Sequence, residues 1–341
     1  MPSASVPPAT SPTSAASGEK GAPQIAQWAA QVQAGDVRAI SRAMTEIENR
    51  SQNAESLLRE LFPHTGHSYC VGITGAPGTG KSTLVDRLAA HYRAQQQPVG
   101  VIAVDPSSPF TGGAILGDRI RMQGHASDSG VFIRSMATRG SLGGLSQATS
   151  DAALLLDAAG KKYVLVETVG VGQGEVEIAR LADCTLVVLV PGMGDDVQNL
   201  KAGVMEIADV FVLNKADREG AERFEQQLRA ILALVPERGG WKPPIVLTVA
   251  TQNEGIDELA RQIDCFRQHF GERGNRRAKE VALWKEKLVN LLRERLLHRV
   301  VDALAANGTL DRIAAEVADR QRDPYSVVSD ILQHEGLGSG H

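Results

Sequence analysis

The chain has 341 residues, of which 43% are hydrophobic and 22% are charged, and its formal net charge is −4. This is the composition of an ordinary globular protein, and the small negative charge gives no overall field that would attract nucleic acid or an anionic membrane. No run of 18 apolar residues occurs, so no membrane-spanning helix is predicted. The three cysteines are widely separated, which argues against a disulfide framework and favours a reducing compartment. We therefore expect a cytoplasmic protein.

The first 66 residues contain two kinds of sequence. Residues 1–22 are rich in Ser, Ala and Pro, which predicts a disordered tail. Residues 23–66 have apolar residues at helical spacing, which predicts two or three helices.

Residues 67–270 have a different pattern, in which short aliphatic runs alternate with helical stretches. Apolar strands separated by helices predict an α/β domain with a mostly parallel central sheet covered by helices on both faces. The predicted strands are YCVGITG, PVGVIAVD, VFIRSM, KYVLVET, CTLVVLV, VFVLNK and PIVLTVA.

Residues 271–338 are predicted to be helical. A charged link, RGNRRAKE, leads into a long helix with one apolar stripe, and a second short helical segment follows at 310–333. The stripe is predicted to join two copies of the chain, and its alternative role is to pack back on its own domain. Its residues are Val281, Trp284, Leu288, Leu292, Leu296, Val300 and Leu304.

A glycine-rich loop follows the first predicted strand and precedes a predicted helix. Its sequence, GAPGTGKST, has the spacing G-x-x-x-x-G-K-S in the context that a phosphate-binding loop requires. Its backbone N–H groups can cradle phosphate oxygens at the positive end of a helix. Lys81 would reach the terminal phosphates, and Ser82 would offer its hydroxyl to Mg²⁺. The predicted nucleotide-binding residues of this loop are Gly75, Ala76, Pro77, Gly78, Thr79, Gly80, Lys81, Ser82 and Thr83.

The run VFVLNKAD carries an N-K-x-D motif at a strand end, formed by Asn214, Lys215 and Asp217. A carboxylate there can accept hydrogen bonds from N1–H and the exocyclic amine of guanine, neither of which adenine offers. The motif therefore predicts GTP as the nucleotide. Ala250 and Thr251, in TVATQNEG, lie where a turn of small residues would contact the guanine edge, although a plain strand-to-helix loop is an equal alternative.

Acidic residues after two predicted strands are candidates for a magnesium site. Asp105 ends the strand VGVIAVD and can hold a water of the ion, or else cap the turn before Pro106. In the following loop, Asp118 is a further candidate ligand and Arg121 a bidentate phosphate donor, with a solvated Asp–Arg pair as the alternative.

Glu167 and Gly170 form an E-x-x-G pattern after the strand KYVLVET. We expect Glu167 to contact the metal through a water and Gly170 to donate its N–H to the γ-phosphate, in a loop whose glycines permit rearrangement. Val171 stands where Ras-like proteins have a water-orienting glutamine, so intrinsic hydrolysis should be slow and need a partner. In PGMGDDVQNLKAG, Lys201 or Gln198 would swing to the nucleotide, unless this stretch is only an acidic helix cap.

With these motifs together, the chain resembles the MeaB/ArgK family of P-loop GTPases, which are chaperones of adenosylcobalamin-dependent acyl-CoA mutases. The matching stretches lie between residues 25 and 300 and are GAPGTGKST, AVDPSSPFTGGAILGDRIRM, GSLGGLS, LVETVGVGQ, GMGDDVQNLKAG and NKAD. The resemblance implies a P-loop NTPase fold and a GTPase that gates cofactor loading and protects or reactivates methylmalonyl-CoA mutase. It also implies a homodimer joined through the C-terminal helices.

The resemblance further implies roles for individual residues. It treats residues 190–201 as an additional switch, with Lys201 as the residue that responds to the mutase, and it assigns Arg121 a nucleotide contact. The implied Mg²⁺ ligands are Ser82, Asp105, Asp118 and Glu167. The residues expected to take part in catalysis are Lys81, Asp105, Glu167 and Lys201.

Two other functions are alternatives to this one. A GTP-driven metal insertase would need a cluster of soft ligands, but the sequence has no C-x-x-C, no C-x-C and no His-rich tract. A transport-linked kinase is disfavoured by the lack of a recognisable acceptor-binding insert. The chain also lacks the D-x-H-x-x-G motif of cobalamin-binding relatives, so we expect no cobalamin site of its own and a mutase on a separate chain.

Overall fold

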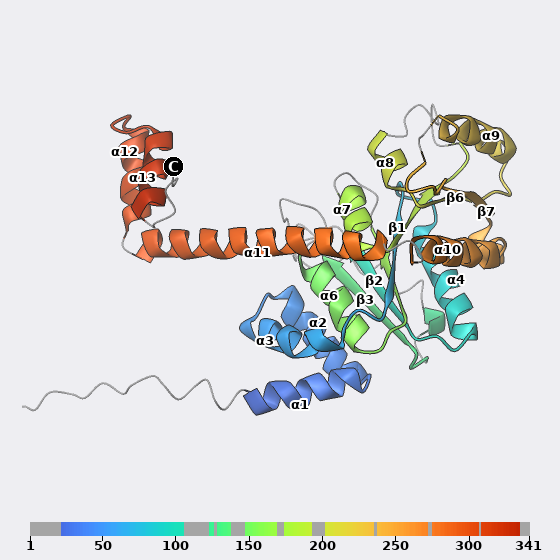
Figure 1. Cartoon of the computed structure of the whole chain (residues 1–341), viewed down its shortest axis with the longest axis horizontal. Helices are drawn as coiled ribbons and strands as arrows, with labels where there is room; N and C mark the ends of the chain where they lie inside the picture. Colours follow the sequence, from blue (N-terminus) through green and yellow to red (C-terminus); the bar gives the residue numbers. More distant parts are fainter. Residues whose placement is uncertain are drawn as a thin grey trace, which may run out of the picture. The chain divides into compact units, whose positions relative to one another are not determined.

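The computed structural model describes residues 22–105, 123–125, 128–137, 147–168, 174–192, 202–234, 237–271, 275–306 and 308–334. The chain divides into two compact units, residues 1–273 and 274–341 (Figure 1). Within the described ranges, every helix is too short or too polar to serve as a membrane span.

Seven parallel strands form the sheet of the first unit, in the order β3-β2-β4-β1-β5-β6-β7. All seven coincide with the predicted apolar runs, so the prediction of a mostly parallel sheet is confirmed. The runs are mostly apolar because helices cover both faces. The strands are β1 (Tyr69–Thr74), β2 (Val99–Asp105), β3 (Val131–Ala137), β4 (Tyr163–Glu167), β5 (Cys184–Leu189), β6 (Val210–Asn214) and β7 (Ile245–Thr248).

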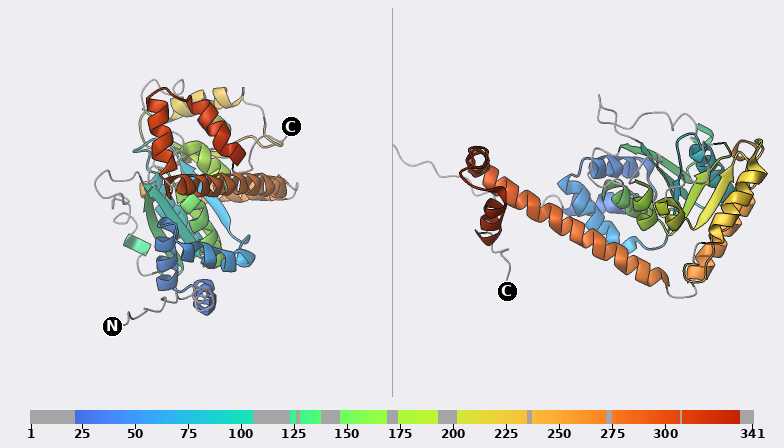
Figure 2. Two further views of the ribbon diagram at one scale, coloured as in Figure 1. Left: turned by 90° about the vertical axis from the view of Figure 1, so that its left-hand side faces the viewer. Right: turned by 90° about the horizontal axis from the view of Figure 1, so that it is seen from above.

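Alternate residues along each strand serve opposite faces of the sheet. Leu165 of β4 packs with α4 (Lys81–Ala94) and α10 (Ile256–Gly271), whereas Val164 and Val166 pack on the other side. The same alternation holds for β1, β2, β5 and β6. Figure 2 shows the resulting helical layers on the two faces. The second layer is formed by α6 (Gln147–Ala158), α7 (Gly174–Leu181), α8 (Ala202–Ile207) and α9 (Ala221–Leu232).

Three N-terminal helices add a further layer over α6. Asp36 and Ser51 cap two of them, since each side chain accepts a hydrogen bond from a backbone N–H of the first turn. Arg134 of β3 donates to Glu48 at 2.6 Å, which joins this layer to the edge of the sheet. The helices are α1 (Ala22–Gln33), α2 (Val37–Glu48) and α3 (Gln52–Leu61), followed by a short turn, η1 (Phe62–His64).

The parallel arrangement brings distant parts of the chain to one edge of the sheet. The carboxyl ends of all seven strands lie at that edge, and β1 is central in the strand order. Ile73 of β1 is in register with Glu167 of β4, and both side chains face α4. The loop that follows β1 therefore lies between the ends of β4 and β5, where ligands bind in open parallel sheets.

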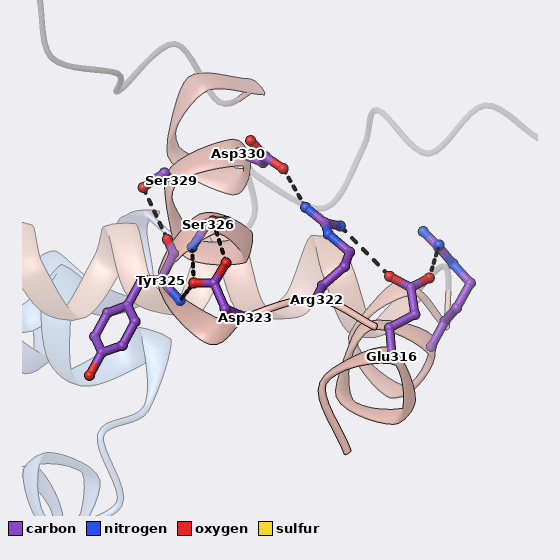
Figure 3. Close-up of polar contacts among 8 residues, drawn as sticks. Glu316, Arg322, Asp323, Tyr325, Ser326, Ser329 and Asp330 are labelled. Carbon is purple, nitrogen blue, oxygen red and sulfur yellow. Dashed lines mark hydrogen bonds and ion pairs between the residues drawn. The ribbon is translucent and has the colours of Figure 1, made fainter. Parts of the chain in front are cut away.

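In the described part of the C-terminal unit there are three helices, α11 (Asn275–Ala306), α12 (Thr309–Ala318) and α13 (Pro324–His334). Two predictions needed correction here. Most of the charged link is the first turns of α11, because its Arg, Ala, Lys and Glu residues favour a helix. The segment 310–333 is interrupted before Pro324, where Asp323 accepts hydrogen bonds from Tyr325 N and Ser326 N and begins α13. Arg322 pairs with Glu316 of α12 and Asp330 of α13 (Figure 3).

Candidate functional site

The glycine-rich loop packs against two neighbouring strands. Gly75 and Gly80 have φ values of 141° and 91°, which disfavour residues with a side chain. A Cβ atom would lie 2.2 Å from Val188 O at Gly75 and 2.5 Å from Asn214 Nδ2 at Gly80. Both distances are shorter than any real contact, so only glycine fits. The loop can therefore approach β5 and the end of β6 directly before α4 begins at Lys81.

Lys81 folds back over this loop. Its Nζ atom donates hydrogen bonds to Gly75 O at 2.8 Å and Ala76 O at 3.0 Å, and the residue is only 6% exposed. Thr79 Oγ1 also donates to Ala76 O, at 2.9 Å. A buried ammonium group at the N-terminus of a helix, beside a glycine-rich loop, is an arrangement that attracts phosphate.

Ser82 and Glu167 meet beside the loop. Ser82 is the second residue of α4, and its Oγ donates to Glu167 Oε1 at 2.6 Å; both residues are 6% exposed. Magnesium takes oxygen ligands and is usually held by one or two protein groups together with phosphates and waters. A hydroxyl and a carboxylate next to a phosphate-binding loop fit that ion.

Asn214, at the end of β6, joins the loop to the end of β7 and the turn that follows it. Its Nδ2 donates to Thr79 O at 2.8 Å. Its Oδ1 accepts hydrogen bonds from Thr248 Oγ1 at 3.1 Å and from Ala250 N at 3.2 Å. Asn214 is 2% exposed, so these contacts replace water on both ends of its amide. One side chain thus connects three segments at the edge of the sheet.

Lys215 adds a second connection. Its Nζ donates to Gly78 O at 2.8 Å, and its φ of 57° is a left-handed conformation that is uncommon for a residue with a side chain. Such strain is often found at functional sites. Asp217 is exposed in the turn that follows, Ala250 is buried and Thr251 is exposed.

Two further candidate residues of the site were not predicted from the sequence. Thr168 Oγ1 donates to Thr74 Oγ1 at 3.0 Å, and Thr168 N donates to Ile73 O at 3.0 Å. Thr168, which directly follows Glu167, is 5% exposed, and Thr74, which directly precedes Gly75, is 0% exposed. They therefore bind the ends of β4 and β1 together at the site. Their only sequence signal is a hydroxyl residue at the tip of an apolar strand.

The other predicted residues lie at the same edge of the sheet or outside the described ranges. Asp105 is the last residue of β2, at the same edge of the sheet, and nothing is described of its side chain. Ala76, Pro77, Gly78 and Thr83 lie in or directly beside the loop, within reach of solvent. The remaining predicted residues lie outside the described ranges, and these are Asp118, Arg121, Gly170 and Lys201.

The fold and this loop define a P-loop NTPase. The model of the family described as Methylmalonyl Co-A mutase-associated GTPase MeaB matches residues 40–305. The chain belongs to this family and is a GTPase of the MeaB type.

Relatives and a solved structure agree with that assignment. A protein named as a GTPase in Pyrococcus abyssi is 49% identical over 309 residues, which cover 90% of this chain and 95% of that protein. GTPase ArgK of Escherichia coli is 36% identical over 299 residues, covering 84% of this chain and 88% of ArgK. A crystal structure described as LAO/AO transport system kinase has a TM-score of 0.69 and 26% identity, covering 92% of this chain and 98% of its own. The predicted family is therefore confirmed.

Proposed function

We propose that this chain is a GTP-hydrolysing chaperone of an adenosylcobalamin-dependent acyl-CoA mutase, with methylmalonyl-CoA mutase as the first candidate. One observation carries the proposal: in a chain matched by the MeaB family model, Asn214 ties the N-K-x-D motif to the phosphate-binding loop. Binding of a guanine nucleotide requires these two elements at a set separation. The family description itself associates its members with methylmalonyl-CoA mutase.

In this proposal, residues 75–83 hold the phosphates and the N-K-x-D motif reads guanine. Lys81 leaves its carbonyl acceptors to neutralise the terminal phosphates, and Arg121 and Gly170 add contacts to them. Ser82, Glu167, Asp105 and Asp118 hold Mg²⁺ directly or through waters. The ion supplies charge stabilisation for the transferring phosphoryl group.

Coupling to the mutase is assigned to the segments next to the nucleotide. Since Val171 cannot orient water as a glutamine would, intrinsic hydrolysis is slow. Residues 190–201 act as the switch that the mutase engages, and Lys201 completes the site when the partner binds. The GTPase domain comprises residues 67–270, preceded by the helical segment 23–66 and followed by the dimerisation segment 271–338.

The decisive measurement is GTP turnover with and without candidate mutases. We expect at least a tenfold stimulation by one of the methylmalonyl-, ethylmalonyl- or isobutyryl-CoA mutases, which corresponds to about 1.4 kcal/mol of barrier. A Lys81→Ala variant is the control and should neither bind nor hydrolyse GTP. Unchanged turnover with all three mutases would contradict the chaperone role while leaving the GTPase assignment in place.

A transport-linked kinase is the second candidate, because the solved structure with 26% identity is described as one. The same phosphate loop can transfer a phosphoryl group to water or to an acceptor hydroxyl. With γ-labelled GTP we expect only free phosphate as the labelled product. A stable labelled protein or small molecule would favour the kinase instead.

A further inference from the structure

Arg87 lies on α4 and contacts the turn at Ala250 and Thr251, which the sequence predicts to lie at the guanine edge. Its Nε atom donates to Ala250 O at 3.2 Å, a contact between residues 163 positions apart in the chain. Ala250 opens a short turn, η3 (Ala250–Gln252), directly after β7. The helix that carries Lys81 and Ser82 at its N-terminus therefore also holds the turn at the opposite end of the proposed nucleotide site.

Both backbone polar groups of Ala250 form hydrogen bonds. Its N–H donates to Asn214 Oδ1 at 3.2 Å, and its carbonyl accepts from Arg87 Nε and, at 3.3 Å, from Asn253 N. It is 2% exposed. Because the peptide bond is planar, a fixed Ala250 carbonyl also sets the direction of the next N–H group, that of Thr251.

The direction of the Thr251 N–H group matters because guanine and adenine differ in the hydrogen-bonding group that they present. Guanine presents an acceptor, O6, where adenine presents a donor amine. A backbone N–H that points at this position favours guanine and leaves adenine with two opposed donors. Asp217 is proposed to read the other side of the base, at N1–H and the exocyclic amine. The two sides are therefore read by independent groups.

We propose that Arg87 is a positioning residue that sets the preference for a 6-oxopurine nucleotide by holding the turn at Ala250. This inference rests on the proposed function, namely that a guanine nucleotide binds at this edge of the sheet. Arg87 touches neither the phosphates nor the metal ligands in this assignment. Its loss should therefore change nucleotide selection without changing the hydrolysis step.

The test compares three nucleotides in the full-length protein. GTP and ITP both carry O6, ATP does not, and ITP lacks only the exocyclic amine. We expect Arg87→Met to weaken GTP and ITP by the same factor, about three- to tenfold for one hydrogen bond, and to leave ATP affinity unchanged. The single-turnover rate at saturating GTP should equal that of the wild type. Calorimetry and rapid-quench measurements give these values.

His91 offers a matched control one turn further along α4. Its Nδ1 contacts Asp257 Oδ1 at 2.8 Å, so it ties the same helix to α10 without touching Ala250. His91→Ala should retain the wild-type preference among the three nucleotides. If Arg87→Met does not fold, Arg87→Lys, which keeps the charge but lacks Nε, should give the same pattern.

The outcomes separate this inference from the function on which it rests. A wild-type protein that binds ATP as tightly as GTP would overturn the proposed function. A wild type that prefers GTP, with an Arg87→Met variant of unchanged preference, would overturn the role of Arg87 alone. An equal loss of affinity for all three nucleotides would likewise mean that Arg87 only stabilises the fold.

Discussion

At the scale of residues, Asn214 shows how the candidate site is organised. Its amide uses a donor toward Thr79 and an acceptor toward Thr248 and Ala250, which neither Asp nor Leu could reproduce. These contacts hold the glycine-rich loop and the turn after β7 at a set separation. Less conformational freedom is then lost on binding, which favours affinity.

Asp217, which is exposed, is proposed to read the base, and its substitution tests that assignment. In Asp217→Asn the carboxylate becomes an amide, so one acceptor is replaced by a donor. We expect GTP affinity to fall about a hundredfold, the effect of losing a hydrogen-bonded charge, and XTP to become the better competitor. Displacement of a fluorescent nucleotide measures both. Glu219→Gln, which removes an equal charge from the same turn, is the control, and failure of XTP to compete would refute the base assignment.

The buried Thr74–Thr168 pair gives a stability prediction. Thr168→Val leaves the Thr74 hydroxyl buried without its partner, which costs about 1–3 kcal/mol, whereas removing both hydroxyls is far less costly. We therefore expect the double variant Thr74→Val/Thr168→Val to be more stable than the Thr168→Val single variant. Urea unfolding of the wild type, the two single variants and the double variant measures the four free energies. Simple addition of the two single effects would show that the hydroxyls do not interact.

At the scale of elements, α4 is fixed at its far end by a bidentate ion pair. Arg93 Nε and Nη2 contact the two carboxylate oxygens of Asp128 at 2.8 and 2.9 Å, just before β3. Gly130 N donates to the same carboxylate, and a Cβ at Gly130 would collide with the Arg93 guanidinium at 2.2 Å. The helix that carries Lys81 is thus tied to the sheet at its carboxyl-terminal end as well.

This ion pair predicts a pH dependence of stability. The hydrogen bond from Arg93 holds the pKa of Asp128 below its ordinary value. The contribution of the ion pair to the free energy of unfolding is therefore present above the pKa of the carboxyl group in the unfolded chain, about 4. It is lost as the pH falls through the pKa of Asp128 in the folded protein. We expect Asp128→Asn to be less stable than wild type by about 1 kcal/mol at pH 7, since the pair is partly exposed. Thermal unfolding should show the two proteins converging in acid, and a constant difference would contradict this.

At the scale of the whole molecule, most of the apolar stripe of α11 is exposed. Thirty-two residues at 1.5 Å each make a helix of about 48 Å. Leu288 and Leu292 are 57% and 61% exposed, and such a stripe is typical of an interface. We propose that two copies of the chain pair through it.

The proposed dimer can be tested by placing one charged residue in the apolar stripe of α11. Leu292→Glu places a carboxylate in the centre of the stripe, where burial in a dimer would be costly, and should convert a dimer to a monomer in light scattering. Asn290→Glu adds the same charge to an exposed position of α11 and should leave the dimer intact. A wild-type protein that is already monomeric would contradict the proposed interface.

Much of the fold could be predicted because its signals are local. Each strand is a short, mostly apolar run of the kind that parallel sheets bury on both faces, and most boundaries carry glycine, proline or a polar residue. The break before Pro324 was missed although Asp-Pro is a local helix start, because the flanking segments have similar helical spacing. The positive φ of Lys215 has no such signal, since tertiary contacts rather than residue type impose it.

By itself, the sequence determined the residue types that are proposed to meet phosphate, magnesium and guanine, since each motif is contiguous and its chemistry depends on neighbours within a few positions. Only the tertiary structure decided which motifs touch. Asn214 meets Thr79 across 135 positions, Thr168 meets Thr74 across 94 and Arg87 meets Ala250 across 163. These pairings follow from the strand order, which places β1 between β4 and β5. That order arises from the packing of the whole sheet, and no local stretch of sequence encodes it.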